Sequence, residues 1–268
     1  MFFKRLISGI ILLAAAIALF YIGGIPLLIV VCLIALTGQK ELYKAIGIDH
    51  KALSLIGYVM TVVYYGLLLV EGKDYMTAIM VGSLLSMMTA YVATFPEYKT
   101  EQVSGAYFGF IYVSVLMSFI YLTRAHSDGI YFVWLILLSA WGCDTCAYCV
   151  GRLIGKHKMA VKLSPKKTIE GAIGGFVGSA ALGALYGFIF AGKMDTPFPV
   201  LICAIACGAG AVISMIGDLA ASAIKRNHDI KDFGNLIPGH GGILDRFDSM
   251  LFAAPAIYYA ILFMERFF

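Results

Sequence analysis

Carboxylates and basic side chains gather near the C-terminal end of an otherwise apolar chain. Asp218, Ser222 and Lys225 are separated by four and three residues, so a helix would carry them on one face. Further along, Asp245 and Asp248 are three residues apart and would project to one side. Mg²⁺ prefers such oxygen ligands together with substrate phosphates. The spacing therefore predicts a divalent-cation site built from Asp218, Asp245 and Asp248.

The segment between these two groups is rich in charge and in glycine. Arg226 and Lys231 follow the first group, and Arg246 lies between the last two aspartates. The glycine-rich part reads Pro238-Gly239-His240-Gly241-Gly242. Glycine permits close approach of the backbone to a ligand, and the histidine could donate to a phosphate. A hydrated loop with incidental ion pairs is the alternative, but so many charges beside apolar segments favour a binding site.

Another carboxylate, Asp144, lies inside an apolar stretch. An ionisable residue within a membrane span is costly and indicates function by default. An aspartate near the membrane surface, paired with a lysine of the next loop, is the alternative. Cys143, Cys146 and Cys149 around it imitate a metal motif. Their spacing on an apolar helix favours packing over an iron–sulfur cluster, which normally needs four thiolates on a folded loop.

A basic segment precedes a second apolar stretch and reads Ser164-Pro165-Lys166-Lys167-Thr168. Serine is a preferred N-cap and proline suits the first helical position, so we expect a helix to start at this serine. Its free N–H groups and the two lysines would attract a phosphate or nucleotide. A basic anchor at the membrane surface is the alternative. Small residues then recur at every fourth position, which favours close helix packing: Gly171, Gly175, Ser179, Gly183 and Gly187.

The composition identifies the elements that must position these residues. Lys, Arg, Asp and Glu make up 13% of the 268 residues, whereas soluble domains carry about 25%. Hydrophobic residues make up 61% and the mean hydropathy is +0.88. These values exclude a soluble enzyme, a disordered chain and a small disulfide scaffold. We expect an all-α polytopic membrane protein of about nine transmembrane helices, near residues 6–22, 26–39, 52–70, 75–95, 102–123, 129–150, 169–191, 197–224 and 249–264.

The distribution of basic residues predicts the orientation of these spans. With the N-terminus in the cytoplasm, 16 Lys and Arg residues fall on the cytoplasmic side and 4 outside. The charge-free stretch from Leu6 to Gln39 is too long for a signal peptide, so we interpret it as two uncleaved spans. We expect residues 1–125 to form a scaffold, with a possible oligomer contact, and residues 126–268 to form the catalytic part.

The pattern from Ser222 to Asp248 resembles the signature of the phosphatidate cytidylyltransferases, also called CDP-diacylglycerol synthases. It reads Ser222-x-Ile224-Lys225-Arg226-x4-Lys231-Asp232-x-Gly234-x2-Ile237-Pro238-x-His240-Gly241-Gly242-Ile243-x-Asp245-Arg246-Phe247-Asp248. The blocks Asp144–Gly151 and Ser164–Gly171 resemble other parts of that family. The resemblance covers about the last half of the chain, and the N-terminal spans match only in hydrophobic character.

The resemblance implies a reaction, its partners and a location. The family condenses CTP with phosphatidic acid to give CDP-diacylglycerol and pyrophosphate, with Mg²⁺. A second cation, Mg²⁺ or K⁺, is an option. The location would be the cytoplasmic side of the bacterial inner membrane. The partners would be the two substrates and membrane lipid, with no nucleic acid, and a homodimer through transmembrane helices is left open.

The same resemblance assigns roles to individual residues. The catalytic set is Asp144, Lys167, Asp218, Lys225, Asp245 and Asp248. The further substrate contacts are Ser164, Lys166, Thr168, Arg226, Lys231, His240, Gly241, Gly242 and Arg246. The aspartates hold the metal centre, although Asp144 could instead fix a lysine. The two lysines of the catalytic set bind CTP phosphates or the leaving pyrophosphate, and Arg226 and Arg246 orient the phosphatidate.

Two other functions compete with this interpretation. The CDP-alcohol phosphotransferases are also membrane-bound and rich in carboxylates, but their Asp-Gly-x2-Ala-Arg pattern is absent. A cation- or proton-coupled transporter could use Asp144 and Asp218 as relays within the membrane. Transporters usually carry internal repeats with broken helices in both halves. The polar residues of this chain are concentrated in one half and on one side, which favours an enzyme.

Overall fold

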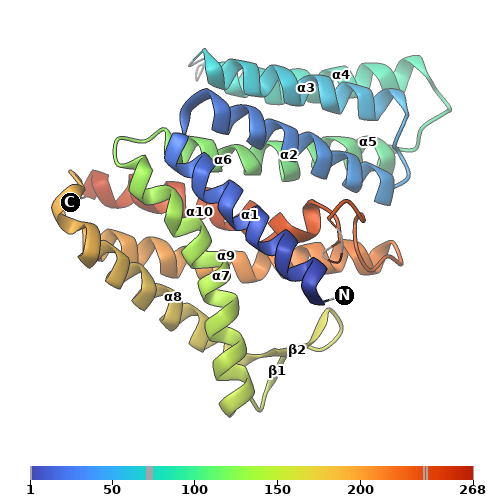
Figure 1. Cartoon of the computed structure of the whole chain (residues 1–268). Helices are drawn as coiled ribbons and strands as arrows, with labels where there is room; N and C mark the ends of the chain where they lie inside the picture. Colours follow the sequence, from blue (N-terminus) through green and yellow to red (C-terminus); the bar gives the residue numbers. More distant parts are fainter. Residues whose placement is uncertain (1, 71–74, 238, 240, 268) are drawn as a thin grey trace.

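The computed structural model describes residues 2–70, 75–237, 239 and 241–267, and most of these are helical (Figure 1). The helices, including a π-helical turn η2 and a 3-10 turn η3, are α1 (Phe2–Ile22), α2 (Gly24–Ala45), α3 (Ala52–Leu69), α4 (Met76–Ala93), α5 (Thr100–Gly109), η2 (Phe110–Val115), α6 (Leu116–Arg124), α7 (Gly129–Ile154), α8 (Ile169–Phe190), η3 (Ala191–Lys193), α9 (Pro199–Asn227) and α10 (Leu244–Phe267). Within the described residues, eight helical segments are long and apolar enough to cross a membrane, and α1 adds the shorter apolar segment Leu13–Ile22. The all-α membrane fold is confirmed.

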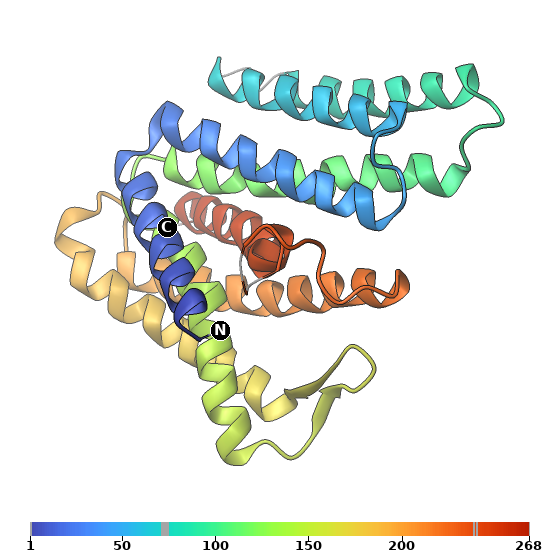
Figure 2. The ribbon, with the colours of Figure 1, turned by 45° about the vertical axis from the view of Figure 1, so that its right-hand side comes forward.

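The helices form successive layers, as both ribbon views show (Figures 1 and 2). The pair α3 and α4 lies on the outside, followed by α2 with α5–α6, then by α10 with α9, and then by α8. Helices α1 and α7 cross these layers at steep angles. The main hydrophobic core joins α2 to the C-terminal helices through residues such as Leu28, Val113, Phe132 and Ile257. The core is therefore continuous across residue 125.

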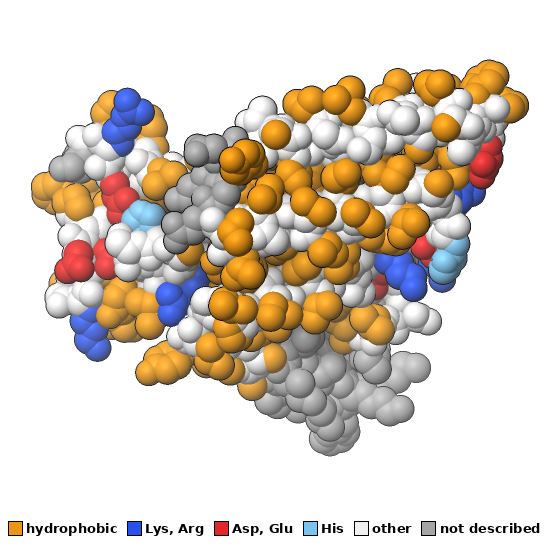
Figure 3. Space-filling model, turned by 90° about the horizontal axis from the view of Figure 1, so that it is seen from above, with side chains coloured by type: hydrophobic (Ala, Val, Ile, Leu, Met, Phe, Trp, Pro, Cys, Tyr) orange, Lys and Arg blue, Asp and Glu red, His pale blue; other side chains and the backbone are white. Residues whose placement is uncertain are grey.

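The outer flanks of this bundle are apolar. Hydrophobic side chains cover the middle of the face in Figure 3, and charged side chains gather toward its two ends. Helix α4 illustrates the pattern, because Leu85 and Val92 are exposed while only Ser83 and Met87 of its residues are buried. Exposed apolar surface on this scale, on helices long enough to cross a bilayer, belongs in lipid. The protein is an integral membrane protein.

The predicted break between the first two spans is confirmed. Gly23 and Gly24 have φ values of 63° and 54°, in the left-handed region that glycine adopts at little cost. Arg124 packs beside Gly23, and its Nε donates to the carbonyl of Phe20 at 2.7 Å. This bond satisfies a free carbonyl at the end of α1.

The expected N-cap at Ser164 is wrong. Residues Ser164–Thr168 form strand β2, which pairs antiparallel with β1 (Lys158–Ala160). Pro165 disfavours a helical conformation for the preceding residue, and the strand pairing supplies an extended alternative. Helix α8 starts at Ile169 instead, where the Thr168 Oγ1 accepts from the Gly171 N–H at 3.1 Å. The expected ladder is confirmed, because the buried residues of α8 are Gly171, Gly175, Ser179, Gly183 and Gly187.

Candidate functional site

Close packing of α9 on α10 brings two of the predicted carboxylates together. A Cβ at Gly217 would lie 2.9 Å from the Asp248 carbonyl oxygen and 2.9 Å from the Phe252 Cβ. Glycine at this position therefore allows the two backbones to approach. As a result, Asp218 and Asp248 lie within electrostatic range of each other. Asp248 also accepts hydrogen bonds from the backbone N and the Oγ of Ser249, at 2.7 and 3.3 Å.

Strand β2 delivers a lysine to the same place. Lys167 forms an ion pair with Asp218, and the exposed fractions of the two side chains are 25% and 29%. Asp144, from α7, lies within electrostatic range of both residues. A cavity of about 370 Å³ adjoins this group, and it collects five of the predicted site residues. They are Asp144, Ser164, Lys166, Lys167 and Thr168.

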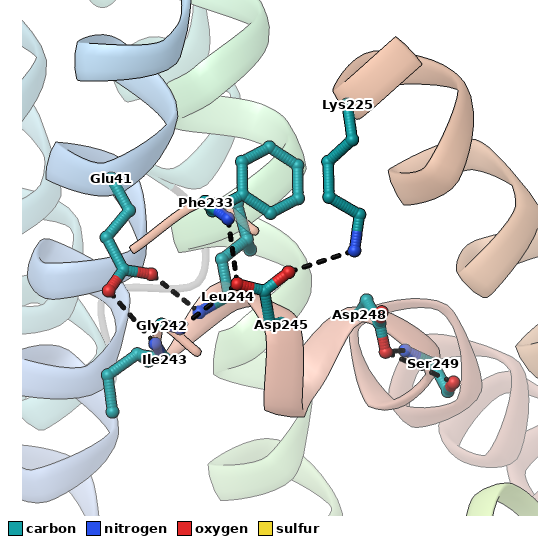
Figure 4. A network of polar contacts seen from close by, with 9 residues as sticks. All are labelled: Glu41, Lys225, Phe233, Gly242, Ile243, Leu244, Asp245, Asp248 and Ser249. Atoms are coloured by element: carbon teal, nitrogen blue, oxygen red, sulfur yellow. Dashed lines mark hydrogen bonds and ion pairs between the residues drawn. The ribbon is translucent and has the colours of Figure 1, made fainter. Parts of the chain in front are cut away.

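A second lysine–aspartate pair holds the loop between α9 and α10 (Figure 4). Lys225 Nζ donates to Asp245 Oδ1 at 2.9 Å, and the Asp245 side chain is only 2% exposed. Its other oxygen, Oδ2, accepts the backbone N–H groups of Phe233 at 2.8 Å and Gly242 at 3.0 Å. Asp245 thus closes the loop onto the first turn of α10, which begins at Leu244 rather than near residue 249. The contacts add a structural role to the metal role expected from the sequence.

The remaining predicted residues lie around this loop. Lys231, Gly241 and Arg246 line a second cavity of about 540 Å³, together with Asp232 and Asn235. The predicted contact Gly242 is buried and donates its N–H to Asp245, as described above. Arg226 is exposed in the last turn of α9, and His240 lies outside the described residues.

The carboxylates are suitable ligands for a divalent cation, but the protein supplies only part of its coordination shell. In the part of the chain that the structure describes, no three His, Cys, Asp or Glu side chains converge on one point. Mg²⁺ is commonly held by one or two carboxylates plus substrate phosphates, so Asp218 and Asp248, which lie within electrostatic range of each other, fit it in number and chemistry. The Lys167 ammonium beside Asp218 shows that this position accepts positive charge. Both Asp245 oxygens are already engaged by Lys225 and by backbone N–H groups.

Two of the three cysteines near Asp144 serve packing, as predicted, whereas Cys149 is exposed. All six cysteines are free, and Cys143 and Cys146 of α7 lie where glycines of α8 leave room. A Cβ at Gly175 would lie 2.8 Å from the Cys143 Sγ, and one at Gly178 would lie 2.5 Å from the Cys146 Sγ. These contacts set the spacing of α7 and α8, and therefore the position of Asp144 relative to β2.

Comparison with known proteins identifies the family. The profile of the cytidylyltransferase family matches residues 3–264. The chain belongs to the cytidylyltransferase family. A phosphatidate cytidylyltransferase of Staphylococcus haemolyticus (strain JCSC1435) is 32% identical over 258 residues, covering 94% of this chain and 96% of the relative. One of Bacillus subtilis (strain 168) is 29% identical over 267 residues, covering 96% and 97%, and one of Staphylococcus aureus (strain COL) is 32% identical over 266 residues, covering 94% and 96%.

Membership in the cytidylyltransferase family decides between the functions left open by the sequence. The match extends through the N-terminal spans, beyond the half of the chain that carries the signature. A transporter and a CDP-alcohol phosphotransferase are therefore set aside. The family resemblance predicted from residues 222–248 is confirmed.

Sequence reasoning missed two residues of this cytidylyltransferase that lie in its N-terminal half. Glu41, at the end of α2, accepts the backbone N–H groups of Ile243 at 3.0 Å and Leu244 at 2.8 Å, which caps α10 (Figure 4). Tyr112, in η2, lies within electrostatic range of Asp248 and Asp218. Glu41 looked like an ordinary charge at the end of a span, and Tyr112 like an ordinary aromatic residue within one. An acidic residue so close to an apolar span is the one signal that could have pointed to Glu41.

Proposed function

We propose that this protein transfers CMP from CTP to phosphatidic acid, giving CDP-diacylglycerol and pyrophosphate in phospholipid biosynthesis. The names of the relatives support this activity. The observation that carries it is the group formed by Lys167, Asp218 and Asp248 beside a cavity. A site for two polyanionic substrates needs positive charge next to carboxylates that can hold a cation.

The reaction needs no nucleophile from the enzyme. A phosphate oxygen of phosphatidate attacks the α-phosphorus of CTP, and the bond from that phosphorus to the pyrophosphate oxygen breaks. That phosphate oxygen is ionised near neutral pH, so no proton has to be removed from it first. The chain's own residues therefore bind, orient and neutralise the substrates.

The assignment of roles follows the positions of the side chains. Asp218 and Asp248 would hold a divalent cation, for which Mg²⁺ is suited, and such a cation neutralises phosphate charge when bound. Lys167 lines the cavity, where it would bind the phosphates of CTP or the leaving pyrophosphate. Arg246 lines the second cavity and orients the phosphatidate, with Arg226 at the end of α9. Asp144 lies near Lys167 and keeps that ammonium at the cavity. A second cation, Mg²⁺ or K⁺, belongs to the same proposal.

The site lies on the cytoplasmic side of the bacterial inner membrane in this proposal. The excess of Lys and Arg in the segments that share a side with the site supports this orientation. Residues 126–268 supply most of the catalytic groups, and residues 1–125 supply a scaffold. The exposed apolar face of α4 is available for association of two copies through transmembrane helices.

Release of pyrophosphate tests the activity directly. The purified protein in detergent is given CTP and phosphatidate with Mg²⁺, and pyrophosphate and CDP-diacylglycerol are measured. We expect one pyrophosphate per CDP-diacylglycerol, with no release when phosphatidate is left out or replaced by diacylglycerol, which lacks the attacking phosphate. Pyrophosphate release without the lipid product, or a preference for another nucleoside triphosphate over CTP, would contradict the proposal.

A further inference from the structure

A buried hydroxyl group within electrostatic range of Asp218 and Asp248 has no hydrogen-bond partner in the described residues. Tyr112 is 3% exposed, and in the described part of the chain its Oη makes no hydrogen bond. Neighbouring tyrosines are satisfied, because Tyr43 donates to the Ala106 carbonyl at 2.7 Å and Tyr65 to the Ser114 carbonyl at 3.1 Å. Buried polar groups in folded proteins nearly always have a partner. The exception at Tyr112 therefore requires an explanation.

The position of the Tyr112 ring is fixed by two phenylalanines. The ring stacks on Phe108, with 4.9 Å between centroids and 10° between planes, and meets Phe252 edge-on at 6.0 Å. Phe252 follows Asp248 by four residues on α10, so the two side chains share a face. Phe252 also occupies the space that Gly217 leaves next to Asp218. The ring is thus packed on the surface that carries both carboxylates.

The backbone around Tyr112 is unusual. It belongs to η2, a π-helical turn, and such turns occur often at functional sites. Ser114 anchors the turn, since its carbonyl accepts from Tyr65 and its Oγ lies 2.8 Å from the Thr61 Oγ1. These bonds hold the turn without using the Tyr112 hydroxyl. The hydroxyl therefore keeps its hydrogen-bonding capacity unused within the described part of the chain.

We propose that the Tyr112 hydroxyl donates a hydrogen bond to a phosphate oxygen of a substrate bound beside Asp218 and Asp248. A phosphate oxygen is a strong acceptor, and a neutral phenol can approach it without adding charge next to two carboxylates. This inference rests on the proposed function. It makes the N-terminal half a contributor to the reaction as well as a scaffold. The phosphate can come from CTP or from phosphatidate, and separate titrations distinguish them.

The substitution Tyr112→Phe tests the inference, because it keeps the ring contacts and removes only the hydroxyl. We expect the rate in detergent to fall about 10- to 100-fold, the range for one hydrogen bond to a charged group. The melting temperature should not fall, since no bond within the protein is lost. A rise in half-saturation for CTP, or for phosphatidate, identifies the substrate that accepts the bond. Tyr65→Phe is the matched control for stability and should lower the melting temperature, because it removes a hydrogen bond within the protein.

Two results would overturn the inference. One is a Tyr112→Phe rate within about twofold of the wild-type rate, well below the loss expected for such a bond. The other is a drop in melting temperature equal to that of Tyr65→Phe, which would make the hydroxyl structural. Thermal stabilisation by Mg²⁺ with CTP alone, and by Mg²⁺ with phosphatidate alone, needs no turnover and separates this inference from the proposed reaction. We expect one of the two ligands to stabilise Tyr112→Phe less than wild type, and equal stabilisation by both contradicts the inference even if the protein lacks the proposed activity.

Discussion

Two lysine–aspartate pairs join α9 to its neighbours, and their surroundings differ. The Lys167–Asp218 pair is partly exposed, and its lysine lines a cavity. Asp144 and Asp248 lie within electrostatic range of Asp218. The Lys225–Asp245 pair is less exposed, at 15% and 2% of the two side chains, and its carboxylate accepts two backbone N–H groups as well as the ammonium. We call Lys167–Asp218 the open pair, because it lies beside a cavity, and Lys225–Asp245 the closed pair, because both carboxylate oxygens already accept hydrogen bonds.

The difference indicates that some of the predicted site residues are available to bind substrate, whereas others hold the backbone in place. A partly exposed ion pair contributes little to stability, about 0–1 kcal/mol, so Lys167 and Asp218 are free to exchange partners when substrates arrive. A buried pair is costly to break, because the remaining charge is left without a partner. Asp245 and Glu41 together fix the backbone between Phe233 and Leu244, and thereby the start of α10 and the position of Asp248 (Figure 4).

The largest effect is expected at the open pair. Asp218→Asn should reduce turnover by about 100-fold or more, equivalent to ~2.7 kcal/mol of barrier, because it removes a charged cation ligand. The melting temperature should change little. Asp248→Asn should behave in the same way, since its hydrogen bonds are to the adjacent Ser249. Initial rates and melting curves of the purified variants provide the measurement, and a tenth or more of wild-type activity in both would remove Asp218 and Asp248 from the metal site.

The closed pair should respond in stability as well as in activity. Asp245→Asn leaves the mostly buried Lys225 without its anion and weakens two backbone hydrogen bonds, so we expect a loss of about 3 kcal/mol in the free energy of unfolding. Thermal unfolding in detergent, compared with Asp218→Asn, measures the contrast. Equal melting temperatures for Asp245→Asn and wild type would show that Asp245 acts only in the reaction. The closed pair would then have no structural role that the open pair lacks.

The fold was predictable because the charges delimit the spans. A transmembrane helix needs about 20 apolar residues, and the intervals between charges place most helix ends within a few residues of those observed. The β1–β2 hairpin was not predicted, since the serine, proline and threonine of its second strand are also helix-start signals. The carboxylates of the site could be identified in the sequence from their spacing and their position next to apolar segments. The partners of Asp245 are backbone N–H groups, and the contact from Glu41 to Leu244 spans 203 positions, so no local pattern reports either.

Substitution of the lysines gives a smaller and more informative contrast. Lys167→Ala and Lys225→Ala should each lower the rate at saturating CTP, or raise its half-saturation, by about tenfold, ~1.4 kcal/mol. Only Lys225→Ala should also lower the melting temperature, because it leaves the buried Asp245 carboxylate without its cation. Kinetics against CTP and melting curves on the same preparations test both statements. A melting temperature that falls equally for the two variants would mean that the open pair is structural too.

The smallest effect is expected from the exposed lysines around the β1–β2 hairpin. Lys156, Lys158 and Lys162 are exposed and lie outside the lining of the cavity that contains Lys167. They should attract anionic lipid at about 1 kcal/mol per residue, an interaction that salt screens. Replacing them with alanine should therefore cause a mild loss of rate in vesicles, which grows with anionic lipid content and disappears at high salt. Rates of the single and triple variants against CTP, at low and high salt, decide the matter. If these variants are as impaired as Lys167→Ala at every salt concentration, phosphate binding is spread over the whole basic hairpin, and the open Lys167–Asp218 pair does not define the site.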